Sequence, residues 1–63
     1  MNRIAMLRKE KGLSQISLSL KLNVSQKMIS AYENGKSEPS IATLMQMADI
    51  FNTSVDYIIG YTN

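Results

Sequence analysis

The chain has 63 residues, of which 44% are hydrophobic, and its net charge is +2. This length suits one core, so we expect a single domain over residues 1–63 and no separate ligand-sensing domain. Cys and His are absent, which excludes disulfides, thiolate metal sites and the commonest general base. No apolar stretch approaches a membrane span, and no signal-peptide pattern begins the chain. We therefore expect a cytoplasmic protein with no membrane, metal or cofactor partner.

The charges are divided unevenly along the chain. Residues 1–36 carry seven basic and two acidic side chains, a net charge of +5, whereas residues 37–63 carry three acidic and no basic ones, a net charge of −3. A basic half is what a surface that faces phosphates requires. The alternative is that a helical domain simply scatters charge over its solvent-exposed faces.

Apolar periodicity, together with cap and stop residues, predicts five helices and no strands. The first helix spans about 2–11 and is followed by Gly12 as a left-handed stop. The second begins after Ser14, a good N-cap, and ends near residue 22, before a tight turn at Asn23.

The other three helices are also predicted to begin after serine caps. Ser25 precedes the third helix, which ends at 34–35; Ser40 precedes the fourth, and Ser54 precedes a short fifth helix over 55–59. The apolar positions that share an inward face define the expected core: Ile4, Leu7, Leu13, Leu18, Leu22, Val24, Ile29, Ile41, Leu44, Ala48, Phe51 and Ile58.

The second and third helices, over about 14–34, are joined by a very short turn. Two helices that cross through such a turn can expose one N-terminus and one polar face, and that shape fits a DNA major groove. The side chains left on the outer side of the third helix are Gln26, Lys27, Met28, Ser30 and Ala31.

Over about fifty residues the chain carries a series of short motifs in a fixed order and spacing. They are Leu7-Arg8, Gly12-Leu13-Ser14-Gln15, Val24-Ser25, Ile29-Ser30, Glu33-Asn34-Gly35-Lys36, Pro39-Ser40, Thr43-Leu44, Ala48, Ser54 and Asp56. In this order and spacing the chain resembles the phage repressor/Cro-type (XRE-like) helix-turn-helix family. The resemblance implies a compact, all-α, five-helix lambda-repressor-like domain that binds DNA through its second and third helices. The sequence departs from the family at Asn23 and Asn52, where Gly is usual, but Asn tolerates the left-handed conformation.

On this hypothesis the third helix reads the bases. Gln26 and Lys27 lie in its first turn; Gln can bond adenine at two atoms, and Lys favours the acceptors of guanine. Met28 and Ala31 suit thymine methyl groups, and Ser30 could reach a base or a phosphate. Because Ala31 is short, DNA shape and backbone contacts gain importance. The alternative is that all five residues solvate a surface helix, with Met28 filling a gap in the packing.

Phosphate contacts are expected at the helix ends. Gln15 begins the second helix, where helix N-termini favour anions, and Ser25 stands at the start of the third. The resemblance implies further phosphate contacts at Asn34, Gly35 and Lys36, although Asn34-Gly35 is also a plain helix stop. No site is assigned to the other exposed cations, which we expect to be solvated: Arg3, Lys9, Lys11 and Lys21.

The resemblance also implies a structural ion pair between Arg8 and Glu33, which would join the first helix to the third. Arg offers a rigid fork that a carboxylate can accept at both oxygens. Such a pair would orient the third helix without touching a base.

The end of the chain holds more apolar groups than one short helix can bury. Val55 and Ile58 can face the core, which leaves Tyr57, Ile59 and Tyr61 at least partly exposed. We interpret these three as a dimer surface; the alternative is a frayed C-terminus folded over the domain. A two-fold dimer would place its reading helices at half-sites about 34 Å apart on a near-palindromic operator.

The sequence thus predicts a homodimeric transcriptional regulator that binds specific double-stranded DNA and represses by occluding a promoter. Its own concentration, competition or a protein partner would switch it. The alternative is a protein-interaction module or antitoxin-type partner with the same fold, and a phage or mobile-element circuit fits as well as an antitoxin. An enzyme is excluded, because the scattered acids form no nucleophile–base pair and no phosphate-binding glycine loop is present.

Overall fold

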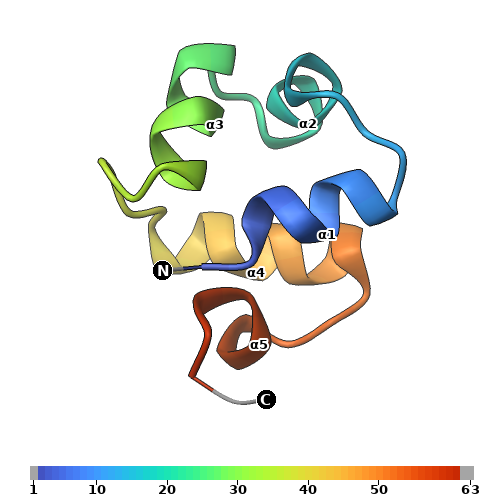
Figure 1. Cartoon of the computed structure of the whole chain (residues 1–63), viewed down its shortest axis with the longest axis vertical. Coiled ribbons are helices and arrows are strands. Elements are labelled where there is room, and N and C mark those ends of the chain that lie inside the picture. The colour runs from blue at the N-terminus through green and yellow to red at the C-terminus, as the bar shows by residue number, and fades with distance from the viewer. Residues whose placement is uncertain (1, 62–63) are drawn as a thin grey trace.

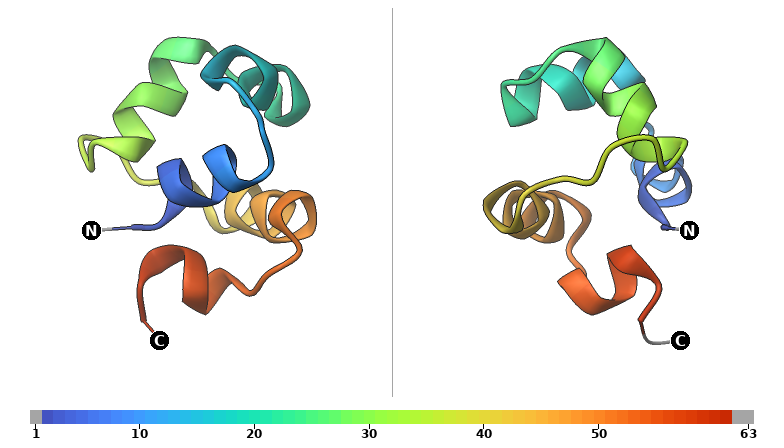
Figure 2. Two further views of the ribbon diagram at one scale, coloured as in Figure 1. Left: turned by 45° about the vertical axis from the view of Figure 1, so that its right-hand side comes forward. Right: turned by 90° about the vertical axis from the view of Figure 1, so that its left-hand side faces the viewer.

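The computed structural model describes residues 2–61, in which five helices and no strand are found. The α2–α3 pair lies at one end of the long axis and α5 at the other, with α1 and α4 between them (Figure 1, Figure 2). None of these helices is long and apolar enough to span a bilayer. The helices are α1 (Ile4–Glu10), α2 (Gln15–Leu22), α3 (Gln26–Glu33), α4 (Ile41–Phe51) and α5 (Val55–Ile59).

A serine caps the N-terminus of each helix from α2 to α5. Its Oγ accepts a hydrogen bond from the backbone N–H three residues further on, over 2.9 to 3.1 Å. This bond satisfies one of the N–H groups that a first helical turn leaves without an intrahelical acceptor. The predicted starts of these four helices are confirmed, at the caps Ser14, Ser25, Ser40 and Ser54.

Two asparagines end helices in the left-handed conformation. Asn23 after α2 has a φ of 57°, and Asn52 after α4 has a φ of 54°. Asn is one of the few residues with a Cβ that adopts this conformation routinely, because its short polar side chain can hydrogen-bond locally. The expectation that Asn replaces Gly at these stops is confirmed by the backbone angles.

Helix α1 is shorter than the predicted span of 2–11. It begins at Ile4, after the N-cap Arg3, whose backbone angles are not helical. The Asn2 side-chain oxygen, outside the helix, accepts a hydrogen bond from the Ile4 N–H over 3.0 Å. It ends at Glu10, and the predicted left-handed stop at Gly12 is present with a φ of 70°.

The core is built from one face of each helix and contains most of the predicted residues. Leu13, Val24 and Ala48 pack against it while only partly buried. The prediction is wrong at Ile41, which is 69% exposed because it opens α4 one turn before the first buried residue of that helix. The buried members are Ile4, Leu7, Leu18, Leu22, Ile29, Tyr32, Leu44, Met47, Phe51 and Ile58.

Candidate nucleic-acid interface

The amino-terminal turns of α2 and α3 are linked by two glutamines. The Gln26 Nε2 donates to the Gln15 Oε1 over 3.4 Å, which is a long hydrogen bond. In each helix the serine cap satisfies one N–H group of the first turn, and the other N–H groups of that turn have no intrahelical acceptor. Each helix N-terminus also carries the positive end of the helix dipole. Two helix N-termini, of the kind that favours anions, are therefore held side by side.

The outer side of α3 carries all five predicted base-contact residues. Gln26, Lys27 and Met28 are exposed, Met28 by 39%, whereas Ser30 and Ala31 are half-buried. The opposite side of the helix buries Ile29 and Tyr32 in the core. The first turn of α3 is thus more open to a ligand than the second, and base contact by these residues stays a prediction.

A polar network joins α1, α2 and α3 behind this face. Arg8 donates from Nε to Glu33 Oε2 over 2.6 Å, from Nη2 to Glu33 Oε1 over 3.3 Å and from Nη1 to the Leu13 carbonyl over 2.8 Å. The side chains of Arg8 and Glu33 are only 11% and 8% exposed. Gln15 adds a hydrogen bond from its Nε2 to Glu33 Oε1 over 3.1 Å. The chain of contacts runs from the buried ion pair through Gln15 to the exposed amide of Gln26.

The Glu33 carboxylate is charged in this network. Burial by itself would raise the pKa of Glu33, but the hydrogen bonds from Arg8 and Gln15 and the charges of Arg8 and Lys9 outweigh it, so that the pKa lies below its ordinary value. The pair therefore stays ionised at neutral pH, and the Arg8 charge is compensated.

The predicted phosphate-contact residues lie at three helix ends. The Ser25 Oγ accepts from the Met28 N–H over 3.0 Å, which leaves its hydroxyl hydrogen for a further acceptor. At the far end of α3, Asn34 and Lys36 are exposed, and the Lys36 N–H donates to the Ala31 carbonyl over 2.9 Å. The turn that follows α3 ends this helix whether or not it binds DNA, and its phosphate contacts stay predictions.

The predicted dimer residues are unequally exposed. Ile59 is 45% and Tyr61 79% exposed, whereas Tyr57 is half-buried beneath the guanidinium of Arg3, which lies 4.1 Å from the ring centroid. Arg3 Nη1 also donates to the Tyr57 carbonyl over 2.6 Å. The expectation that Arg3 is a solvated charge is therefore wrong.

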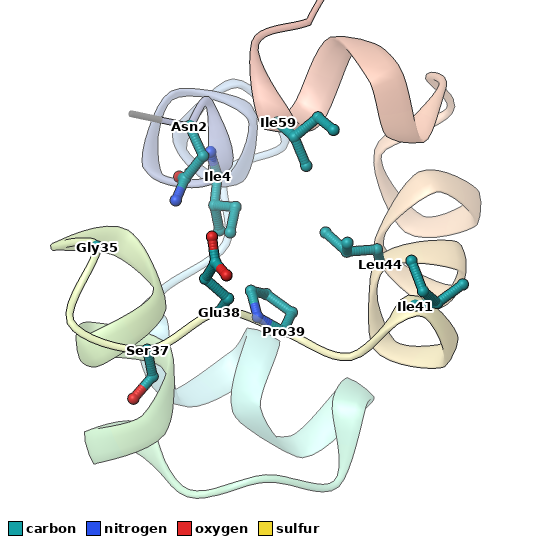
Figure 3. A pocket seen from close by; sticks show the side chains of 9 residues that line it. All are labelled: Asn2, Ile4, Gly35, Ser37, Glu38, Pro39, Ile41, Leu44 and Ile59. Atoms are coloured by element: carbon teal, nitrogen blue, oxygen red, sulfur yellow. The ribbon is translucent and has the colours of Figure 1, made fainter.

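A hollow of about 500 Å³ opens between α1, α4, α5 and the loop after α3 (Figure 3). Leu44 of α4 points into it, Ile59 of α5 lines it from a neighbouring side, and Ile41 lies beside Leu44 on α4. Within residues 2–61, no group of His, Cys, Asp or Glu could hold a metal ion.

Two contacts around the candidate site were missed by sequence reasoning. Gln15 bonds a residue 18 positions away, Glu33, and the Asn2 side chain bonds the Tyr32 carbonyl 30 positions away, over 2.8 Å. Neither contact has a local sequence signal, because each arises only when the helices are packed.

Comparison with known proteins gives consistent matches over almost the whole chain. The sequence profile of the helix-turn-helix family matches residues 4–58. The chain is 31% identical over 58 residues to the HTH-type transcriptional regulator ImmR of Bacillus subtilis (strain 168), covering 92% of this chain and 46% of that protein. It is 34% identical over 58 residues to the immunity repressor protein of Bacillus phage phi105, covering 92% of this chain and 40% of that protein.

A solved structure matches the fold as well. The crystal structure of a transcriptional regulator from Listeria innocua superposes with a TM-score of 0.85 at 32% identity, covering 94% of this chain and 55% of that chain. The chain thus spans about half the length of these relatives.

Proposed function

The chain belongs to the helix-turn-helix family of the phage repressor/Cro type, and from this membership we propose that it is a sequence-specific DNA-binding regulator of transcription. The observation that carries the proposal is the pairing of two capped helix N-termini, α2 and α3, through Gln15 and Gln26. An α-helix fits the major groove, and helix N-termini bind phosphate. The proposal includes no catalytic step, and it places the protein in the cytoplasm, where its DNA would be.

Base recognition is assigned to the first turn of α3. The Gln26 amide uses one hydrogen on Gln15, which leaves its second N–H and its carbonyl oxygen for the two atoms that adenine offers. Lys27 is exposed one residue further on and can reach the guanine acceptors. Met28 provides an apolar contact for a thymine methyl group, and Ser30 and Ala31 are the half-buried members of this face.

Phosphate contacts would fix the domain on the duplex. Gln15 and Ser25, at the N-termini of α2 and α3, would donate to one phosphate backbone, and Asn34 and Lys36, at the end of α3, would donate beyond the reading turn. These contacts carry no sequence information but set the register of α3 in the groove. The basic half of the chain supplies the attraction, because seven of its charges are positive.

We further propose that two copies bind a near-palindromic operator. Exposed Ile59 and Tyr61, with Tyr57 beside them, are the support for a two-fold contact through α5, and Ile41 extends the apolar area across the hollow. A repressor would act by covering a promoter; the phage phi105 relative is named an immunity repressor protein.

The test is selection from a random duplex DNA library, followed by binding of the enriched sequence at two salt concentrations. We expect a near-palindromic sequence whose affinity falls steeply with salt, since bound phosphates release counterions. Failure of folded protein to enrich any sequence would overturn the proposal.

A second candidate is binding of a protein partner, as an antitoxin-type module or as the step that switches the regulator. Ile16 and Leu20 favour it, because these apolar side chains lie one turn apart on α2 and are 54% and 76% exposed. Weak salt dependence and no enriched DNA sequence would support this candidate over the first.

A further inference from the structure

The Asn2 side chain contacts two helices at once. Its oxygen accepts from the Ile4 N–H at the start of α1 over 3.0 Å, and its nitrogen donates to the Tyr32 carbonyl in the last turn of α3 over 2.8 Å. The same carbonyl also accepts from the Gly35 N–H, over a longer distance of 3.3 Å. One amide thus caps the beginning of one helix and the end of another.

The next residue continues this link to α5. The Arg3 backbone N–H donates to the Ile58 carbonyl over 2.7 Å, and its guanidinium donates to the Tyr57 carbonyl and covers the Tyr57 ring. In Figure 3, Asn2 lies at the start of α1, with Gly35 to one side of it and Ile59 of α5 to the other. Residues 2 and 3 therefore connect the end of α3 to the end of α5, and we call them the brace.

We propose that Asn2 is a positioning residue for base recognition, which holds the axis of α3 at its carboxyl end. This inference rests on the proposed DNA-binding function. The ion pair with Arg8 holds α3 by a side chain, that of Glu33, whereas Asn2 bonds its backbone and so constrains the helix itself.

Geometry makes the far end of α3 sensitive to this bond. An eight-residue helix is about 12 Å long, so a tilt of about 5° about its carboxyl end moves its first turn by about 1 Å. A displacement of that size breaks hydrogen bonds of normal length. Gln26 and Lys27 lie in the turn that would move, although Asn2 itself touches neither of them.

The test separates the two bonds of Asn2. In Asn2→Ser the hydroxyl can still accept from the Ile4 N–H, as Ser does in this kind of local turn more weakly than Asn, but it is too short to reach Tyr32. Asn2→Asp is the second variant: it keeps the shape and the cap and cannot donate to a carbonyl. Ser40→Ala is the matched control, since it removes the N-cap of α4, a helix outside the brace.

Two measurements decide the outcome. Amide hydrogen exchange should become several-fold faster at Gly35 and Lys36 in both Asn2 variants and stay unchanged in Ser40→Ala. The ratio of operator affinity to non-specific DNA affinity should fall about two- to tenfold in both Asn2 variants, which is the range for one lost hydrogen bond. Taking this ratio cancels the general electrostatic effect of the added Asp charge.

Three results would overturn the proposal: an unchanged affinity ratio in folded Asn2→Ser and Asn2→Asp, a parallel loss of both affinities, or an equal fall of the ratio in Ser40→Ala. Wild-type protein that enriches no DNA sequence would instead refute the proposed function. The role of Asn2 in base recognition would then be refuted as well. Faster amide hydrogen exchange at Gly35 and Lys36 in the Asn2 variants would still show that the Asn2 bond holds the end of α3.

Discussion

Arg8 donates to both carboxylate oxygens of Glu33, and this buried ion pair fixes α1 against α3. A third bond from Arg8 to the Leu13 carbonyl ties the connection between α1 and α2 to the same point. Every polar atom of the pair has a partner, since no buried side-chain nitrogen or oxygen among residues 2–61 lacks one. The pair therefore couples the packing of α1 to the placement of α3.

Arg8→Ala should lower the free energy of unfolding by about 3–5 kcal/mol, because it leaves the Glu33 charge buried without compensation. A loss of this size is comparable to the whole stability expected of a chain of 63 residues. Urea and thermal denaturation would measure it, with Lys21→Ala as the control, because Lys21 is exposed and its charge is not among those that lower the pKa of Glu33. A midpoint of thermal unfolding within a degree or two of wild type would contradict the role given to the pair.

The stability that Glu33 supplies should depend on pH. Its pKa is lowered in the folded protein, so its contribution is present above the unfolded pKa of about 4.3 and is lost as pH falls through the folded pKa. The difference in unfolding free energy between wild type and Glu33→Gln should thus be largest near neutral pH and shrink below about pH 4. A difference that stays constant from pH 7 to about pH 3 would show that the charge of Glu33 is not stabilising.

Substitution of the left-handed asparagines by Gly or by Ala should change the free energy of unfolding in opposite directions. Asn23→Gly and Asn52→Gly should each raise the free energy of unfolding by about 0.5–1 kcal/mol, because Gly has no Cβ to strain at a φ near 55°. Asn23→Ala should lower it by about 1 kcal/mol, since Ala has neither this freedom nor the polar side chain. Thermal unfolding of the three variants would show whether the signs differ as expected.

Lys27 and Lys36 should affect DNA binding differently. Lys27→Ala should cost about 1–3 kcal/mol mainly at one base position, because Lys27 is placed to contact a base edge. Lys36→Ala should weaken binding to all sequences alike and reduce the salt slope by about 1. Titrations of both variants with the operator, its single-base changes and random DNA would compare them. Identical behaviour would refute the division into reading and positioning residues.

Substitution of Ile59 should weaken self-association on DNA. Ile59→Asp places a charge in the apolar area beside Tyr61, where burial against a second copy would be costly. Met45→Asp is the matched control, since Met45 is an exposed apolar residue on α4 that does not line the hollow. Sedimentation with operator DNA would give the stoichiometry. Wild-type protein that stays monomeric on the operator would refute the dimer.

Sequence reasoning was successful where a few neighbouring residues determine the structure. A serine cap depends on a backbone N–H three residues away, so Ser14, Ser25, Ser40 and Ser54 could be placed without any tertiary information. The same holds for Asn23, whose left-handed φ follows from the tight turn that it occupies. These local rules, with helical periodicity, were sufficient for the number and order of the helices.

Contacts between helices were beyond such rules. Periodicity places Ile41 with Leu44 and Ala48, but whether the first turn of α4 is covered depends on the loop and on α5. Likewise, no pattern in the sequence indicates that Arg3 covers Tyr57. For the candidate site, the family resemblance supplied the residues, and the structure added the bonds of Gln15 that join the ion pair to the outer face.

The serine caps also bear on how the chain folds. Each cap closes a loop of only three residues, so the ends of four helices can form before distant segments meet. Helical domains that are rich in such local contacts reach the native state within microseconds to milliseconds. We therefore expect this chain to fold in that time range, with its helix boundaries established before the packing that joins them.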